Sequence, residues 1–398
     1  MPDIALIAPL QLDELAKHGI PAELAGADGI NRAHNMPKQI AAETDLEAIF
    51  AWLNEFPEGS STRRAYHKEV QRFYAWVLAF SGKPLSSLMR EDLENYRAFM
   101  AAPPETWCAP RYHRRGTGLW RPFEKPLSLK SQGQAIIVIN ALFSYLVDAH
   151  YLAGNPLAIM RRKRKGVTKR QRGVPKSIPL HTFERLVEAL QSECERLNGL
   201  GSKHVEMERM LMVIRVLGNT GMRRGELATA LAGDIYQVLD PQTRKGNWFI
   251  TVTGKGDVTD QIAFNPAAVS ALHRYQRVIG IDPHHADPKT PLVVPLGVHG
   301  LSAAYSETVT DQTIYNIVRK ALRVGAKIIK ADSPAEASFL SKATPHYFRH
   351  TFATLMSDMG FPLPLIQKQL RHASIETTVI YTETEKHQLY RAVATLAL

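Results

Sequence analysis

A run of sixteen residues without an acid, RRKRKGVTKRQRGVPK at positions 161–176, most constrains how this chain can fold. Nine of these residues are Lys or Arg, and charges of one sign repel one another when they are brought close together. The run therefore cannot form a core. We predict a basic interdomain linker over 161–178 that separates two folded parts of the chain.

This linker has two interpretations. It is either a solvated segment or an arm that lies along the phosphates of a nucleic acid, where each basic side chain releases a counterion. Its position between two folded parts favours the arm. The candidate DNA-binding residues are then Arg161, Arg162, Lys163, Arg164, Lys165, Lys169, Arg170 and Arg172.

The whole chain is basic as well, with a formal net charge of +11 over 398 residues. That excess suggests nucleic acid as a polyanionic partner, although a merely basic protein would show the same balance. Two cysteines, Cys108 and Cys194, lack the spacing of zinc ligands or of a disulfide framework. The N-terminus is acidic where a signal peptide is basic, and no apolar run approaches the roughly 20 residues of a membrane span. We expect a cytoplasmic protein that does not bind a membrane.

The part of the chain before the linker is predicted to be helical. Residues 1–44 have weak periodicity and are expected to form a partly helical N-terminal extension. In the domain over 45–160, apolar residues recur three and four positions apart, as on one face of a helix. This spacing predicts helices over 61–82, 90–102 and 128–152, with a basic and aromatic loop over 103–126. This composition suits contacts with a nucleic-acid backbone, but a surface loop with a packed Trp would have the same composition.

Residues 179–398 are predicted to form a mainly helical domain with a small antiparallel sheet, which is an α+β arrangement. Two β-rich runs, 247–253 and 258–264, flank a Gly-rich turn and predict a hairpin. No dinucleotide-binding glycine motif and no Walker lysine loop is present. Helical periodicity predicts the other elements, at 180–198, 203–217, 223–232, 266–279, 310–324, 346–359, 363–371, 374–380 and 385–397.

Four short stretches of this second domain contain residues suited to phosphate chemistry, although two of them are weak signals alone. In NTGMRRGEL, Gly221 ends one helix, and Arg223, Arg224 and Glu226 begin the next. Guanidinium groups match phosphate oxygens, but a solvated helix start would show the same residues. In TGKGD, Lys255 lies at the tip of the predicted hairpin, where a plain exposed lysine is the simpler interpretation.

The third stretch, TPHYFRHTFAT, makes a stronger case. Thr344 is placed to cap a helix that begins at Pro345. His346, Arg349 and His350 then fall three and four positions apart on one face of that helix. Such a cluster of cationic and titratable groups repels itself unless an anion binds among them, so this stretch favours a functional site.

The fourth stretch, RHASIETTVIYTETEK, adds His372 and Tyr381. Together the four stretches supply arginines, a lysine, histidines and a tyrosine, but no carboxylate cluster or metal-ligand spacing. Metal-dependent phosphoryl transfer would need Asp or Glu ligands. Fixed cations could instead stabilise the oxygens of a phosphate while a tyrosine attacks the phosphorus and a lysine protonates the leaving alkoxide.

In this order, the four stretches resemble the tyrosine recombinase (phage integrase) family, over roughly residues 45–390. The family's TG-x-R, hairpin-lysine, H-x-x-R-H and T-T-x-x-Y patterns are matched, and its L-G-H pattern is matched except that Arg371 replaces the Gly. The matches imply a helical core-binding domain, a catalytic domain and the following site residues. The catalytic set is Arg223, Lys255, His346, Arg349, His372 and Tyr381, with Glu226 and His350 as supporting residues.

The sequence also departs from the family pattern at three positions near these residues. Arg371 stands where a Gly usually precedes the second His, which could cost backbone freedom or add a phosphate contact. Arg224 replaces a residue that is often small or apolar, and Phe348 stands where Leu is common. None of the three is a catalytic position.

The resemblance implies a site-specific recombinase, or integrase, that cleaves and rejoins double-stranded DNA through a 3′-phosphotyrosyl link without metal, ATP or another cofactor. Arg223 and Arg349 would hold the phosphate beside His372, Lys255 would act as general acid, and His346 as general base or charge stabiliser. A homo-tetramer on two DNA sites is implied, with a C-terminal helix that packs in trans or in cis. A type IB topoisomerase-like enzyme and a DNA-binding protein without catalysis are the alternatives.

Overall fold

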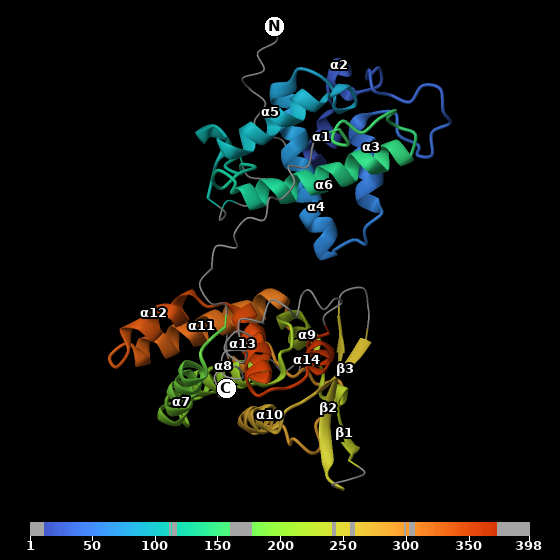
Figure 1. Ribbon diagram of the computed structural model, residues 1–398. Helices are drawn as coiled ribbons and strands as arrows, with labels where there is room; N and C mark the ends of the chain where they lie inside the picture. The colour runs from blue at the N-terminus through green and yellow to red at the C-terminus, as the bar shows by residue number, and fades with distance from the viewer. Residues whose placement is uncertain are drawn as a thin grey trace, which may run out of the picture. The chain divides into compact units, whose positions relative to one another are not determined.

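The computed structural model describes residues 12–110, 113, 118–159, 177–240, 244–254, 259–297, 300–301 and 307–371. The chain divides into two compact units, Met1–Thr168 and Lys169–Leu398 (Figure 1). Each unit has a hydrophobic core of its own. Of the predicted linker, only Ser177 and Ile178 lie within the described residues, so its eight candidate DNA-binding residues lie outside them.

The N-terminal unit is helical throughout its described part. Apart from short 3₁₀ turns, its elements are α1 (Leu12–His18), α2 (Ala22–Ala25), α3 (Asp45–Asn54), α4 (Ser61–Trp76), a π-helical turn (Val77–Ser81), α5 (Arg90–Ala101) and α6 (Leu129–Asp148). Ser60 caps α4 by accepting a hydrogen bond from the Arg63 amide, and Gly82 ends the π-helical turn at φ 66°. The helix predicted over 61–82 therefore changes its hydrogen-bond pattern in the last turn.

Residues 12–44 pack onto this unit. Leu12 and Leu15 of α1 are buried in its core. The Asn31 amide donates to the carbonyl of Ser86 at 2.9 Å, and the Asn31 side chain donates to the carbonyl of Gly154 at 2.7 Å. The stretch that the sequence predicts as a partly helical extension is thus tied to positions more than 100 residues further along the chain.

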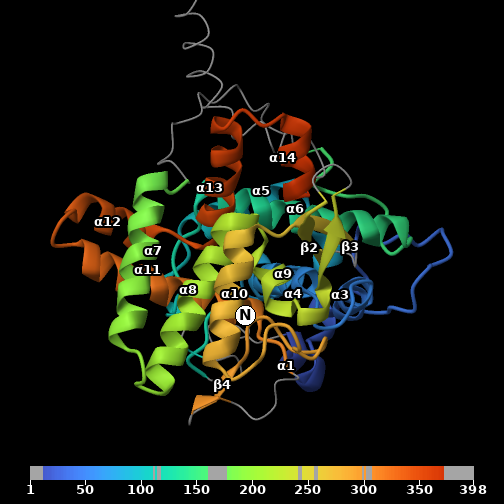
Figure 2. The ribbon, with the colours of Figure 1, turned by 90° about the horizontal axis from the view of Figure 1, so that it is seen from below.

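The C-terminal unit combines helices with two small sheets. Its elements are α7 (Leu180–Arg196), α8 (Ser202–Thr220), α9 (Arg224–Thr229), β1 (Ile235–Leu239), β2 (Gly246–Thr253), β3 (Thr259–Ala263), α10 (Pro266–Val278), β4 (Leu296–Gly297), β5 (Gly300–Leu301), α11 (Asp311–Ile329), α12 (Pro334–Lys342), α13 (Pro345–Asp358) and α14 (Leu363–Leu370). Helix α8 is central because it packs against α7, α10, α11 and α13. Figure 2 shows α13 and α14 side by side.

The three-stranded sheet is antiparallel, with the order β1-β2-β3. Ile250 of β2 pairs with Ile262 of β3, and both side chains are buried, so the apolar alternation of these strands faces the core. Figure 1 shows this sheet at one edge of the helical unit. The predicted fold class, mainly helical with a small antiparallel sheet, is confirmed.

The structure also contains elements that the sequence did not predict. Strand β1 was missed because only its first two residues are partly buried, which leaves no apolar alternation to detect. Helix α12 was missed because it has nine residues and begins at a proline. Helix α9 ends at Thr229, three residues before the predicted end. The helices predicted over 374–380 and 385–397 lie outside the described residues.

Across the described residues, no helix is long and apolar enough to cross a membrane.

Candidate active site

A cleft of about 690 Å³ opens in the C-terminal unit, where the starts of α9 and α13 meet the end of β2 and the start of α11. It is lined by three residues that the sequence predicts to be catalytic and that come from two stretches more than 100 residues apart: Arg223, His346 and Arg349. Glu226 lines it as well. The structure therefore brings together four of the predicted site residues.

The turn between α8 and α9 places Arg223 at the cleft. Gly221 ends α8 with φ 68°, a left-handed conformation that favours glycine. A Cβ atom at this position would lie 2.7 Å from side-chain carbons of both Leu370 and Phe352, so glycine is required by packing as well. Arg223 then takes the N-cap position of α9, and its side chain is 45% exposed.

Glu226 orients Arg223. The carboxylate of Glu226 accepts from the Arg223 backbone amide at 2.7 Å and from Arg223 Nη1 at 2.8 Å. Arg223 Nη2 donates to the carbonyl oxygen of Arg371 at 3.1 Å. A guanidinium that is held on two sides has little freedom left to lose when it binds an anion, which lowers the cost of binding.

Arg349 of α13 is held in a similar way but is buried, with 3% of its surface exposed. Its Nη1 donates to the carbonyl oxygen of Gly221 at 2.6 Å, and its Nη2 donates to the carbonyl oxygen of Leu370. Gln369 anchors the same end of α14, since its amide nitrogen donates to the carbonyls of Thr220 and Ala263 at 3.1 Å each. The ends of α8 and α14 thus form the support for both arginines.

The start of α13 brings two histidines to this region. His346 is exposed at the cleft, and its ring centroid lies 4.3 Å from that of the half-buried His350. Pro345 occupies the first helical turn as predicted. The predicted capping role of Thr344 is wrong, because Thr344 holds the N-cap position but its side chain makes no capping hydrogen bond. Phe348 points the other way, into the core.

The second arginine of the pair does not join the first. Arg224 Nε forms an ion pair with Asp311 at 2.8 Å, and its guanidinium lies over the ring of Tyr315 at 5.5 Å. Arg223 and Arg224 therefore form ion pairs with two different acids at the same cleft, Glu226 and Asp311 respectively.

The contact between Arg371 and Glu226 is not predicted from the sequence. Arg371 Nη2 lies 2.5 Å from Glu226 Oε2, although the two residues are 145 positions apart in the sequence. The only available signal was that an arginine stands where the family pattern has glycine.

The chain is similar to known proteins of one family. Residues 183–388, more than half of the chain, match the Phage integrase family. The chain belongs to the phage integrase family. It is thus a tyrosine recombinase, an enzyme that cleaves and rejoins DNA.

Individual relatives of this integrase-family chain are distant. It is 25% identical to a tyrosine recombinase XerC of Erythrobacter litoralis over 326 residues, which cover 81% of this chain and 90% of the relative. It is 26% identical to a tyrosine recombinase XerD of Rickettsia conorii over 67% of this chain and 77% of the relative. A XerH recombinase bound to a palindromic difH substrate shares the fold, with a TM-score of 0.53 at 18% identity and coverage of 91% and 92% of the two chains.

Three predicted catalytic residues of this integrase, Lys255, His372 and Tyr381, lie outside the described residues. Their immediate neighbours are described at the cleft: Thr253 and Gly254, which precede Lys255 in sequence, line it. Arg371, which precedes His372, contacts Glu226 there. In the described part of the chain, no group of three or more His, Cys, Asp or Glu residues could hold a metal ion.

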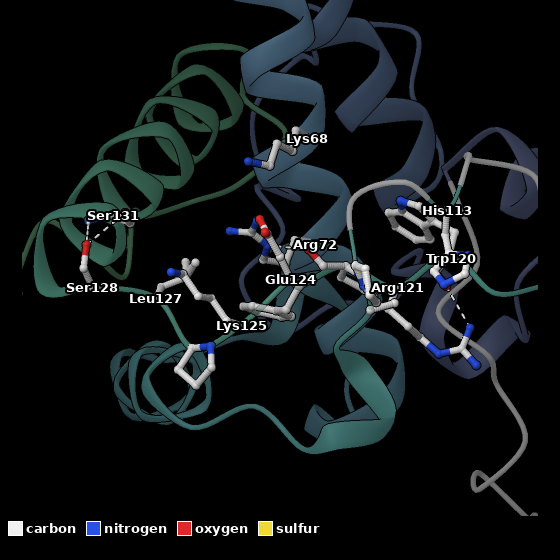
Figure 3. A pocket seen from close by; sticks show the side chains of 15 residues that line it. Lys68, Arg72, His113, Trp120, Arg121, Glu124, Lys125, Leu127, Ser128 and Ser131 are labelled. Atoms are coloured by element: carbon white, nitrogen blue, oxygen red, sulfur yellow. Dashed lines mark hydrogen bonds between the residues drawn. The ribbon is translucent and has the colours of Figure 1, made fainter. Parts of the chain in front are cut away.

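The N-terminal unit of the integrase has a hollow of its own, with a volume of about 760 Å³ (Figure 3). Lys68 and Arg72 of α4 line it together with Lys125 and with Ser128 and Ser131 at the start of α6. Lys68 and Lys125 are exposed, whereas Arg72 is buried and donates to Glu69 and to the carbonyl of Pro122. Two lysines beside a helix N-terminus make this a positive surface.

Proposed function

We propose that this integrase-family protein is a site-specific DNA recombinase that works through a 3′-phosphotyrosyl intermediate without metal or ATP. The observation that carries the proposal is the convergence of Arg223 and Arg349 on one cleft, each with its guanidinium held on two sides. Arg349 is held by main-chain carbonyls at the ends of α8 and α14, and Arg223 by the carbonyl of Arg371 and the carboxylate of Glu226. Preorganised donors of this kind stabilise the charge that develops on phosphate oxygens in a transition state.

In the proposed reaction, the Tyr381 oxygen attacks the phosphorus of a phosphodiester. A tyrosyl O–P bond forms and the P–O5′ bond breaks, so that the leaving 5′ oxygen takes a proton from Lys255. A 5′-hydroxyl from the partner duplex then attacks the phosphotyrosyl link and reverses these bonds. Since the phosphotyrosyl link conserves the bond energy, the cycle needs no high-energy cofactor.

The remaining roles are those that the resemblance to the family implies. Arg223 and Arg349 would bind the non-bridging oxygens, and His372 would hydrogen-bond beside them. His346, exposed at the start of α13, would act as general base or charge stabiliser, and Glu226 would orient Arg223. His350, whose ring contacts His346, would support it.

The proposed substrate is double-stranded DNA, bound by both units. Solved structures that share the fold include a XerH recombinase bound to a difH substrate and a lambda integrase dimer bound to a COC′ core site. Here, the hollow with Lys68 and Lys125 would contact the DNA backbone, and the basic residues of 161–176 would follow the phosphates between the two units. The cytoplasmic location stays a prediction.

The proposed assembly is a homo-tetramer on two DNA sites, with residues 385–397 exchanged as a helix between copies. An apolar groove of about 550 Å³ in the C-terminal unit, lined by residues such as Phe249, Phe352 and Leu365, could receive such a helix. Removing the residues after Glu385 should leave DNA binding by the monomer but abolish the tetramer on DNA, as measured by light scattering. An unchanged tetramer would refute the exchange.

The deciding experiment traps the covalent intermediate. Duplexes that the protein binds are selected from a random pool, and a nick is placed so that the cleaved end is lost and rejoining is prevented. Wild type should then form a protein–DNA adduct that survives denaturation, and Tyr381→Phe should form none. If wild type forms no adduct on a duplex that it binds, the enzymatic proposal fails. Relaxation of supercoiled plasmid without joining of two sites would indicate a topoisomerase-like enzyme instead.

A further inference from the structure

Arg371 adopts a backbone conformation that arginine disfavours. It ends α14 with φ 53° and ψ 52°, in the left-handed region that glycine usually occupies at a helix C-terminus. Within the described part of the chain, only two other non-glycine residues, His150 and Arg244, have positive φ. A side chain kept in such a conformation points to an interaction that offsets the strain.

The side chain of Arg371 makes that interaction in a buried position, with 8% of its surface exposed. Its Nη2 lies 2.5 Å from Glu226 Oε2, and its Nη1 donates to the carbonyl of Gln369 at 2.9 Å. Its Nε is buried without a hydrogen-bond partner. Burial lowers the pKa of the Arg371 guanidinium, and the charge of Glu226 opposes this shift.

Glu226 is therefore shared by two guanidinium groups. One carboxylate oxygen accepts from Arg223 Nη1, and the other from the Arg223 amide and Arg371 Nη2. The carboxylate side chain is only 3% exposed, so water screens these charges weakly. With Arg371, the three side chains carry one net positive charge, whereas Glu226 and Arg223 alone would cancel.

We propose that Arg371 is a positioning residue of this cleft: its guanidinium offsets the charge of Glu226, so that Glu226 orients Arg223 without cancelling the attraction of Arg223 for a phosphodiester. Its carbonyl oxygen holds the other side of the Arg223 guanidinium. The inference rests on the proposed function, because a phosphodiester is the anion that this function brings to the cleft.

The first test removes the charge of Arg371 in two ways. Arg371→Gln keeps a long side chain, and Arg371→Gly also relaxes the backbone at φ 53°. Both should bind inorganic phosphate about tenfold more weakly than wild type and form the covalent adduct about tenfold more slowly, as expected for one charged hydrogen-bonded contact. Phosphate binding is followed through the ring NMR signals of His346, assigned with His346→Asn.

The second test asks whether the charge of Glu226 causes that loss. Glu226→Gln in the Arg371→Gln background should recover most of the lost phosphate affinity and adduct rate, because Gln can still accept one of the two hydrogen bonds from Arg223 and carries no charge. A residue that served only to hold the fold would give additive losses, so the coupling in this double-mutant cycle separates the two roles.

A matched control exists in the same unit. Arg274 pairs with the buried Glu208 at 2.6 Å, and neither residue lines the cleft. Arg274→Gln and Arg274→Gln with Glu208→Gln should lower the melting temperature but leave phosphate affinity and adduct rate unchanged.

The proposal is overturned if Arg371→Gln binds phosphate as tightly as wild type, or if adding Glu226→Gln recovers nothing. Failure of the proposed function would look different, since wild type would then form no adduct with DNA. The phosphate titration needs neither DNA nor Tyr381, so it decides the role of Arg371 in either case.

Discussion

The two units each bury a carboxylate, and they stabilise it differently. Asp45 in the N-terminal unit accepts from the Ser86 amide at 3.0 Å, the Ser86 hydroxyl at 3.1 Å and the Tyr151 hydroxyl at 2.9 Å. These donors are neutral. Burial raises the pKa of Asp45, although the hydrogen bonds and the charge of Arg32 oppose the shift. Glu226 in the C-terminal unit is instead paired with two guanidinium groups.

The partners of the two carboxylates also lie in different kinds of place. The partners of Asp45 come from positions 86 and 151, so it joins three distant segments of one unit, and the resulting cluster does not line the hollow beside α4 and α6. The partners of Glu226 line or adjoin the cleft where an anion would bind. We therefore expect changes at Asp45 to alter stability and changes around Glu226 to alter chemistry.

The largest expected difference is in the rate of adduct formation. Arg223→Ala removes a preorganised donor and should lower this rate on the trapping duplex by about 10²–10³. Asp45→Asn should leave the rate of the folded protein unchanged. Arg185→Ala is the matched control for the lost charge, because Arg185 pairs with Glu336 and Asp332 outside the cleft. An equal loss of adduct rate in Asp45→Asn would contradict the expected difference between the two carboxylates.

The next expected difference is in stability. Asp45→Ala leaves the Ser86 backbone amide and the Tyr151 hydroxyl without their acceptor and should lower the free energy of unfolding by about 1–3 kcal/mol. Urea denaturation followed by tryptophan fluorescence measures this, since four of the five tryptophans (52, 76, 107 and 120) belong to the N-terminal unit. Glu43→Ala, at an exposed ion pair of the same unit, should change stability by less than about 0.5 kcal/mol. Equal effects would show that burial of Asp45 is unimportant.

The smallest expected effect is a pH dependence. Because the pKa of Asp45 is raised in the folded state above its ordinary value of 3.8, the unfolded chain loses this proton first as the pH rises. Wild type should therefore lose stability relative to Asp45→Asn as the pH rises from below 3.8 through the folded pKa. Urea midpoints of both proteins across this range measure the difference. A difference that stayed constant or ran the other way would contradict a raised pKa.

Much of the fold could be predicted from the sequence because long amphipathic segments show their period locally. Helix α7 begins at the predicted residue, and α8 and α11 differ from the predictions only near their ends. The sequence could not reveal β1, because the residues of this strand show no apolar alternation. The strand forms through its pairing with β2. Nor could the sequence show that residues 12–44 join the N-terminal core, since that depends on partners such as Gly154.

The candidate site, like the fold, could be predicted only in part. Arg223, His346 and Arg349 were selected because their residue types and order match a chemistry, and the structure places all three at one cleft. The Glu226–Arg371 pair could not be predicted, because neither local spacing nor residue type links positions 145 residues apart. The positions of Lys255, His372 and Tyr381 stay predictions.

One further consequence comes from the carbonyls that hold Arg349. Its two acceptors, Gly221 and Leu370, lie at the C-terminal ends of α8 and α14. The aligned peptide dipoles of a helix leave about half a negative charge at this end. The guanidinium of Arg349 therefore bridges two negative helix ends. The dipoles of both helices stabilise this cation at the place where a phosphate would bind.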